Sequence, residues 1–181
     1  GATPGQQKAR HRICTIMFGS VLAILLTILA GTVISWLPPS RHPGLADLYP
    51  RYLKPNLNNN SFPSQSTALY AAVTAGIYAL NKGVGSILWV CVGVLVALPR
   101  IYVGGHYPSD ILAGLILGLA GYVSALYFLE PRLVPSLEQV LQEDSRLRIV
   151  RNIVVFVWML QVAVEFRDLI WLKDSLRYVL K

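Results

Sequence analysis

Four long apolar runs, at residues 13–37, 66–80, 84–98 and 110–129, constrain what this chain can fold into. A helix needs about 20 predominantly apolar residues to cross the hydrocarbon core of a bilayer, and the first run exceeds that length. Hydrophobic residues make up 54% of the chain and charged residues only 14%, whereas soluble domains carry roughly a quarter. The sequence therefore predicts an all-α fold, a polytopic membrane helical bundle with four core spans.

The connections between the runs predict how the spans are arranged. The pair Pro38-Pro39 should stop the first helix, and Trp36 just before it suits a membrane–water interface. A polar loop at residues 38–63 follows, and connections of that length often carry function. The tight turn at residues 81–83 predicts that the second and third helices pack as an antiparallel pair.

We expect one membrane domain over residues 1–181, because no Gly/Ser-rich or Pro-rich linker divides the chain. Residues 1–11 are polar and should be extended or frayed. The first run should be a retained span, because it is too long for a signal-peptide core and no small-residue cleavage site follows it. Residues 131–150 are amphipathic and residues 149–164 are apolar, which predicts a C-terminal helix that either lies along the membrane surface or spans the membrane.

The net charge of +7 is carried by basic residues scattered near the ends of the apolar runs. Such charges typically anchor a membrane protein to anionic lipid, and they form no aromatic-interleaved surface of the kind that binds nucleic acid. We therefore expect no nucleic-acid partner. Cys14 and Cys91 each lie inside an apolar run and indicate neither a disulfide framework nor a metal site. The sequence predicts no metal and no cofactor.

The most informative motif lies between the third and fourth runs, where Arg100, His106 and Asp110 stand close together. Ionisable residues at the edge of a membrane span are costly to place and usually functional. Asp110 or Ser109 can cap the helix that follows, and Asp110 can hold one imidazole nitrogen of His106 while the other stays free to attack or to shuttle a proton. Arg100 offers a guanidinium fork that suits a phosphate.

This motif resembles the third signature of the type 2 phosphatidic acid phosphatase and vanadium haloperoxidase superfamily. That signature is Arg, five residues, His, three residues, Asp, and here it reads Arg100, His106 and Asp110 around a His-Tyr-Pro-Ser-Asp core. The family usually has Ser before the Arg, where this chain has Pro99. The resemblance covers residues 13–129, leaves residues 130–181 as a C-terminal extension, and implies a helical bundle with its site in the loops.

The segment at residues 61–68, Ser-Phe-Pro-Ser-Gln-Ser-Thr-Ala, resembles the second signature of the family, Pro-Ser-Gly-His. Gln65 stands where Gly is usual, and Ser66 stands where the family has the His that protonates the leaving group. The resemblance implies that Ser64, Gln65 and Ser66 bind phosphate at a helix start, which agrees with anion binding at helix N-termini. Without the family, Ser64 or Ser66 is simply a helix N-cap.

The first signature, Lys, six residues, Arg-Pro, is almost absent. The nearest candidate is the run at residues 40–43, where His42 falls on the Arg position and Ser35 on the Lys position. Arg41 is a candidate phosphate ligand in place of the missing pair, as is Lys54. His42 is either a replacement acid for the missing His or an ordinary solvated loop residue.

Two hypotheses for function follow. The first is a membrane phosphatase that acts on a lipid phosphate or a polyprenyl or other lipid diphosphate, with His106 as the nucleophile and no metal. A diphosphate is favoured because its leaving group needs an acid least. The second is an inactive family member that serves as a subunit of a membrane complex or binds lipid, which would have membrane protein partners. The survival of Arg100, His106 and Asp110 together favours the enzyme.

The order of the spans places the 38–63 loop and the 100–110 segment on one side of the membrane. That side carries few basic residues, whereas the other side carries Lys8, Arg10, Arg12, Lys82, Arg132, Arg146, Arg148 and Arg151. The positive-inside rule therefore predicts that the site faces the periplasm, a lumen or the exterior.

Overall fold

The computed structural model describes residues 4–49 and 60–132, together with residues 155 and 158. All of the regular structure in these residues is helical, with no strand among them. The principal helices are α1 (Pro4–Val33), α2 (Gln65–Leu80), α3 (Lys82–Cys91), α4 (Leu98–Tyr102) and α5 (Pro108–Ser124), and short 3-10 turns lie at Pro39–Arg41 and Ala46–Leu48. The predicted all-α fold is confirmed for this part of the chain.

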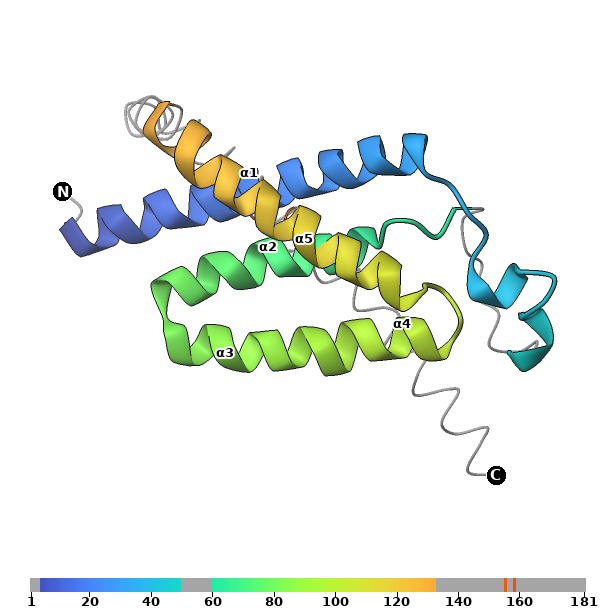
Figure 1. Ribbon diagram of the computed structural model, residues 1–181. Helices are drawn as coiled ribbons and strands as arrows, with labels where there is room; N and C mark the ends of the chain where they lie inside the picture. The colour runs from blue at the N-terminus through green and yellow to red at the C-terminus, as the bar shows by residue number, and fades with distance from the viewer. Residues whose placement is uncertain (1–3, 50–59, 133–154, 156–157, 159–181) are drawn as a thin grey trace.

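Helix α2 lies at the centre of the bundle and packs against α1, α3 and α5 (Figure 1). Small residues allow this close packing, because a Cβ added at Gly114 or Gly118 would collide with the backbone of α2 at Ser64 or Ala68. At the far end of α5, Gly121 lies against Ala23 of α1 in the same way. The small residues of α5 therefore form the surface that holds α1, α2 and α5 together.

Among the described residues, three helices are long and apolar enough to cross a membrane, at His11–Val33, Lys82–Tyr102 and Pro108–Arg132. Helix α2 has 16 residues, so it is about 24 Å long at 1.5 Å per residue, which is shorter than the usual hydrocarbon core. Its neighbours bury most of its first three turns. The chain is therefore an integral membrane protein whose described part holds three candidate spans, and the fourth span stays a prediction.

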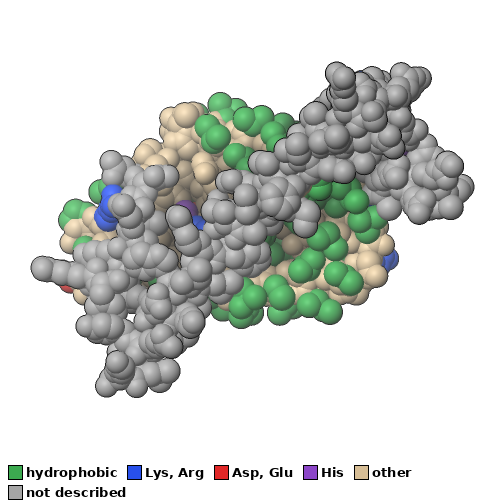
Figure 2. Space-filling model, turned by 180° about the vertical axis from the view of Figure 1, so that it is seen from behind, with side chains coloured by type: hydrophobic (Ala, Val, Ile, Leu, Met, Phe, Trp, Pro, Cys, Tyr) green, Lys and Arg blue, Asp and Glu red, His purple; other side chains and the backbone are tan. Residues whose placement is uncertain are grey.

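The outer surface of the bundle is apolar. Large hydrophobic side chains face outward on three helices, including Leu25 and Leu29 of α1, Ile87 and Val90 of α3, and Ile116 of α5. Figure 2 shows hydrophobic side chains covering much of the visible described surface, with few charged ones among them. A bundle with an apolar exterior and small residues in its interior is what a lipid environment requires.

Several helix boundaries differ from the prediction. Helix α1 includes residues 4–11, which were expected to be extended or frayed, and it ends at Val33, before Trp36. The third helix runs without a break from Lys82 through a π-helical segment at Val92–Ala97 into α4, so Arg100 lies in a helix rather than in a loop. The predicted helical pair is joined by Asn81 alone, whose side chain accepts the Val84 amide at 3.1 Å.

Both extended helices contain a proline just beyond the predicted end of their apolar run, at residues 98 and 129. Pro99 and Pro131 each follow a π-helical segment, the second at Ala125–Leu129. Proline has no amide hydrogen to donate to the carbonyl four residues earlier. The residue before each proline donates five residues back, Leu98 to Gly93 and Glu130 to Ala125, which lets the helix continue.

The predicted C-terminal segments at residues 131–150 and 149–164 lie outside the described residues, apart from residues 131, 132, 155 and 158. Trp158 packs against the core cluster of Ile16, Ala23, Ala68, Ala72 and Tyr122. The candidate phosphate ligand Lys54 also lies outside the described residues.

Candidate active site

The site lies at one end of the bundle, where the turn between α4 and α5, the start of α2 and the loop after α1 meet (Figure 1). Backbone hydrogen bonds join these elements. Ser40 donates its amide to the carbonyl oxygen of Gly104 at 3.0 Å, and Ser64 donates its amide to the carbonyl oxygen of Asp110 at 3.1 Å. The two predicted motifs and the loop at residues 38–49 are therefore brought together, as their order in the chain predicted.

The turn that carries His106 is fixed by the end of α4. Gly104 has a φ of 70°, in the left-handed region that glycine adopts without strain. Its amide donates to Ile101 at 3.0 Å, and the Gly105 amide donates to Arg100 at 2.9 Å. These two bonds form the Schellman arrangement that closes many helices. The His106 amide also donates to the Arg100 carbonyl, at 3.2 Å, so one helix end positions both residues.

The start of α5 positions Asp110. Pro108 occupies the first helical position, where its missing amide hydrogen costs nothing. The Asp110 carboxylate accepts the Tyr107 amide at 2.8 Å, so it caps the helix as predicted, whereas Ser109 is exposed. Helix α5 therefore begins two residues earlier than predicted.

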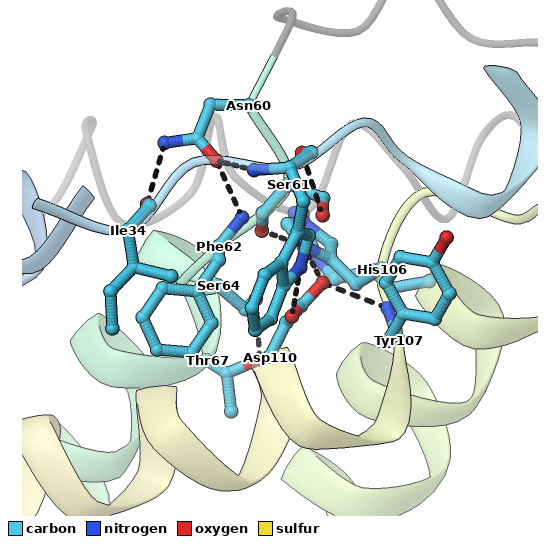
Figure 3. Close-up of polar contacts among 11 residues, drawn as sticks. Ile34, Asn60, Ser61, Phe62, Ser64, Thr67, His106, Tyr107 and Asp110 are labelled. Carbon is cyan, nitrogen blue, oxygen red and sulfur yellow. Dashed lines mark hydrogen bonds and ion pairs between the residues drawn. The ribbon is translucent and has the colours of Figure 1, made fainter. Parts of the chain in front are cut away.

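The contacts of His106 indicate which ring nitrogen carries the hydrogen in its neutral form (Figure 3). Its Nε2 lies 3.4 Å from Nη1 of Arg100, and its Nδ1 lies 2.7 Å from the carbonyl oxygen of Ser61. A guanidinium only donates and a carbonyl only accepts. The imidazole therefore carries its proton on Nδ1 and presents the lone pair of Nε2 to Arg100.

Asp110 stands behind the imidazole, though not as its nearest partner. Its Oδ2 lies 3.7 Å from Nδ1 of His106, beyond direct hydrogen-bond distance, because the Ser61 carbonyl oxygen occupies the closer position. The Asp110 side chain is fully buried, whereas that of His106 is 12% exposed. The predicted pairing of Asp110 with Nδ1 is present at ion-pair distance, with the Ser61 carbonyl oxygen closer to the same nitrogen, and the role of Asp110 stays a prediction.

The predicted phosphate ligands differ in their exposure and in their hydrogen-bond partners. The Ser64 hydroxyl is buried and shares a 2.8 Å hydrogen bond with the Thr67 hydroxyl. Gln65 is exposed at the first position of α2, and Ser66 is nearly buried in the same turn. Arg41 is exposed and directly follows Ser40, whose amide contacts the Gly104 turn. His42 accepts the Gly44 amide at 3.3 Å through Nδ1, a contact within its own loop.

Two tyrosines also border the turn. The ring of Tyr49 packs against Gly104, where an added Cβ would lie 2.7 Å from ring carbons. Burial raises the pKa of the Tyr107 phenol above its ordinary value, and the charge of Asp110 and the neighbouring Tyr49 raise it further. Because an efficient general acid has a pKa near the working pH, Tyr107 is poorly suited to replace the missing histidine.

Sequence reasoning missed the side chains that hold the site from behind. Trp36 was predicted to be an interface anchor, but its indole Nε1 donates to Oδ1 of Asp110 at 3.1 Å. Asn60 ties the end of α1 to the start of the second motif through hydrogen bonds to Gly31, Trp36 and Phe62. No periodicity marks these positions, and only their place beside the motifs in sequence hints at a role.

The sequence resemblance implied a site at one end of a helical membrane bundle with three features. They are a buried carboxylate, a largely buried imidazole and an arginine. The chain belongs to the PAP2 superfamily, whose family model matches residues 12–133. The resemblance is thereby confirmed, and the matched region covers the predicted core.

Curated relatives share part of this region. The bacitracin transport permease protein BcrC of Bacillus licheniformis is 38% identical over 80 residues, covering 40% of this chain and 37% of the relative. The putative undecaprenyl-diphosphatase YbjG of Escherichia coli is 30% identical over 110 residues, 58% of this chain and 54% of the relative. The undecaprenyl-diphosphatase of Sulfolobus acidocaldarius is 30% identical over 105 residues, 58% of this chain and 48% of the relative.

The chain therefore spans about half the length or less of the curated relatives it matches. No solved structure matches it.

Proposed function

We propose that this chain is a membrane phosphatase that removes a phosphate from a lipid phosphate or a polyprenyl or other lipid diphosphate. The observation that carries the proposal is the contact between the Nε2 lone pair of His106 and the Arg100 guanidinium at 3.4 Å. A nucleophile beside a cation that binds phosphate oxygens is the arrangement that phosphoryl transfer needs. Membership of the PAP2 superfamily and the names of the undecaprenyl-diphosphatase relatives support the same reaction.

In the proposed mechanism, Arg100 binds the terminal phosphate oxygens and Nε2 of His106 attacks phosphorus. The bond between phosphorus and the leaving oxygen breaks, and the phosphorylated imidazole gains a positive charge. The Ser61 carbonyl oxygen, 2.7 Å from Nδ1, and the Asp110 carboxylate, 3.7 Å away, stabilise that charge. Water then attacks phosphorus, the P–N bond breaks, and inorganic phosphate leaves with the neutral imidazole restored.

The leaving group narrows the proposed substrate. In the family pattern a histidine stands where this chain has Ser66, and a serine hydroxyl does not donate protons readily at neutral pH. Loss of a general acid costs about a hundred- to ten-thousand-fold, and the cost is smallest for a leaving group that needs no proton. A lipid diphosphate, which releases a lipid monophosphate, meets that condition, so we favour a diphosphate substrate.

The charge distribution of the described helices supports a site on the non-cytoplasmic side. Arg12 pairs with Glu130 at 3.5 Å, which joins the first half of α1 to the helical continuation of α5 at residues 125–132. Arg132 ends that continuation, opposite to the site. Basic residues favour the cytoplasmic side of a membrane. Labelling of Ser109→Cys, but not Lys82→Cys, by a membrane-impermeant thiol reagent added outside would support this orientation, and the reverse pattern would overturn it.

The catalytic proposal is tested by phosphate release from a panel of lipid phosphates and diphosphates in detergent. We expect the native chain to release phosphate, and His106→Ala to release none above background. His106→Asn should also be inactive, although its amide can still donate to the Ser61 carbonyl. His11→Ala, on α1, is the matched control and should retain activity. A phosphoryl group that is trapped on the native protein and labile to acid would identify the phosphohistidine.

The alternative is an inactive member of the family that binds lipid or joins a membrane complex. The substitutions Gln65 and Ser66 in the second motif, and the near absence of the first, favour this alternative. Background release from the native chain and from His106→Ala alike, across the whole panel, would favour it over the enzyme.

A further inference from the structure

The mechanism leaves one buried contact of the site unused. Two of the hydrogen bonds that Asp110 accepts come from the Tyr107 amide to Oδ2 at 2.8 Å and from the Trp36 indole to Oδ1 at 3.1 Å. The first belongs to the start of the aspartate's own helix. The second comes from a residue 74 positions earlier in the chain and has no role in capping α5.

Hydrogen bonds to both the amide and the carbonyl of Trp36 hold its backbone in place. Its amide donates to Oδ1 of Asn60 at 3.3 Å, and its carbonyl accepts the Ser61 amide at 3.0 Å and the Ser61 hydroxyl at 3.3 Å. Its ring lies against the ring of Phe62, with centroids 4.9 Å apart. The indole is therefore fixed by the same short segment, residues 60–62, that supplies the carbonyl for His106.

These contacts join the two supports of the imidazole. Ser61 bonds to His106 through its carbonyl and to Trp36 through its amide, and Trp36 bonds to Asp110. A chain of hydrogen bonds thus runs from His106 through Ser61 and Trp36 to Asp110, and Figure 3 shows Ser61 and His106 beside Asp110. Removal of the indole N–H would break this chain at the carboxylate.

We propose that Trp36 is a positioning residue for the phosphoryl transfer, acting through Asp110, which rests on the function proposed above. With Oδ1 bonded to Trp36 and Oδ2 bonded to the Tyr107 amide, the carboxylate cannot rotate toward His106 and take Nδ1 from Ser61. Trp36 thereby keeps Asp110 as a charge that stabilises the imidazole from 3.7 Å and keeps the Nε2 lone pair directed at Arg100.

Removal of this donor should change the surroundings of the His106 imidazole, because the Asp110 carboxylate loses the bond that fixes Oδ1. The titratable or charged groups that face this pair are Arg100 on the side of Nε2, the Tyr107 phenol at the start of α5, and Tyr49 from the loop beside Tyr107. None of these is altered when Trp36 is replaced by phenylalanine.

The experiment compares Trp36→Phe with Trp89→Phe in the full-length chain in detergent. Phenylalanine keeps an aromatic ring against Phe62 and removes only the N–H and part of the ring area. Trp89 lies on α3, about three turns before Arg100, and makes the control the same substitution at a distance from the site. The readouts are the NMR titration of the His106 ring nitrogens, with His11 and His42 as internal references, and the pH profile of phosphate release.

We expect Trp36→Phe to shift the NMR signals of the His106 ring nitrogens, to change the pH profile of kcat/KM, and to lower kcat roughly tenfold. Trp89→Phe should leave all three unchanged. An unchanged titration and pH profile in a folded Trp36→Phe would overturn the proposal, even if His106→Ala is inactive. If the native chain releases no phosphate but Trp36→Phe still changes the His106 signals, the positioning of His106 is upheld and the proposed function is overturned.

Discussion

The 100–110 turn and the 60–67 segment meet at His106 but are held in different ways. In the 100–110 turn, the amides of Gly104, Gly105 and His106 all return to carbonyl oxygens of α4, and Asp110 accepts the amide of Tyr107. Every one of these bonds closes within eight residues of chain. The contacts of the 60–67 segment reach much further, from Asn60 to Gly31, from Ser61 to Trp36, and from Ser64 to Asp110.

This difference explains why one motif keeps the family pattern and the other does not. A local turn depends on the residue type at each position, because only glycine adopts the φ of Gly104 without strain. The distant contacts of Ser61 and Ser64 use backbone groups, which any residue except proline can supply at the amide. Gln65 and Ser66 can therefore replace the family's Gly and His without loss of the arrangement at His106.

The largest loss of activity is expected from a change in the backbone of the 100–110 turn. Gly104→Val places a branched side chain at a φ of 70° and against the ring of Tyr49. The turn must change conformation, which moves His106 relative to Arg100. Since a displacement of about 1 Å can cost about a hundredfold in rate, we expect phosphate release to fall by that factor or more.

The matched control for that change is Gly93→Ala, because an added Cβ at Gly93 meets nothing within 4 Å. Both variants would be compared by melting temperature in detergent and by kcat. If Gly104→Val remains folded and as active as the native chain, the turn does not position the nucleophile.

A smaller effect is expected from a change at Asn60, whose side chain joins the 60–67 segment to the end of α1. Asn60 uses its amide fully, donating to the carbonyl oxygens of Gly31 and Ile34 and accepting from the amides of Trp36 and Phe62. Asn60→Ala removes all four bonds, but water reaches part of this site, so we expect a loss of about 1–2 kcal/mol in stability. We expect kcat to fall about tenfold, because Asn60 holds the segment that supplies the Ser61 carbonyl to His106.

Asn81→Ala provides the comparison for that loss. Asn81 caps α3 at the other end of the bundle, and its removal should lower the melting temperature by a similar step while leaving kcat unchanged. Equal effects of the two variants on kcat would show that Asn60 acts only through global stability.

The same contrast separates what the sequence predicted from what it did not. Helix α5, its cap at Asp110 and the convergence of the two loops followed from apolar runs, proline positions and the order of spans. The extension of α3 into α4 did not, because Pro99 normally ends a helix and the π-helical segment that accommodates it has no clear sequence signal. The second partner of Nδ1 was missed for a related reason, since the Ser61 carbonyl is a backbone group with no residue signature.

Trp36 shows the limit of reading residue types. A tryptophan at the end of an apolar run typically marks the membrane interface, and Trp36 is 42% exposed, which agrees with that position. Its N–H nevertheless reaches a buried carboxylate, because helix α1 ends at Val33 and the chain then runs alongside residues 60–62. Tertiary contacts of this kind depend on where a helix ends, and sequence patterns set that boundary only to within a few residues.

The smallest effect is expected from a variant that restores the missing acid in the 60–67 segment. Ser66→His places an imidazole in the first turn of α2, where the family has its acid. If the distant contacts hold this segment independently of residue type, the new imidazole should protonate a poor leaving group and raise release from lipid monophosphates relative to diphosphates by up to about tenfold. Ser66 is only 6% exposed, so Ser66→Asn controls for the added volume without an acid, and the measured quantity is the ratio of kcat/KM for the two substrate classes. An unchanged ratio in a folded Ser66→His would mean that the segment no longer presents this position to the phosphate, and that the family arrangement survives only on the side of Arg100 and His106.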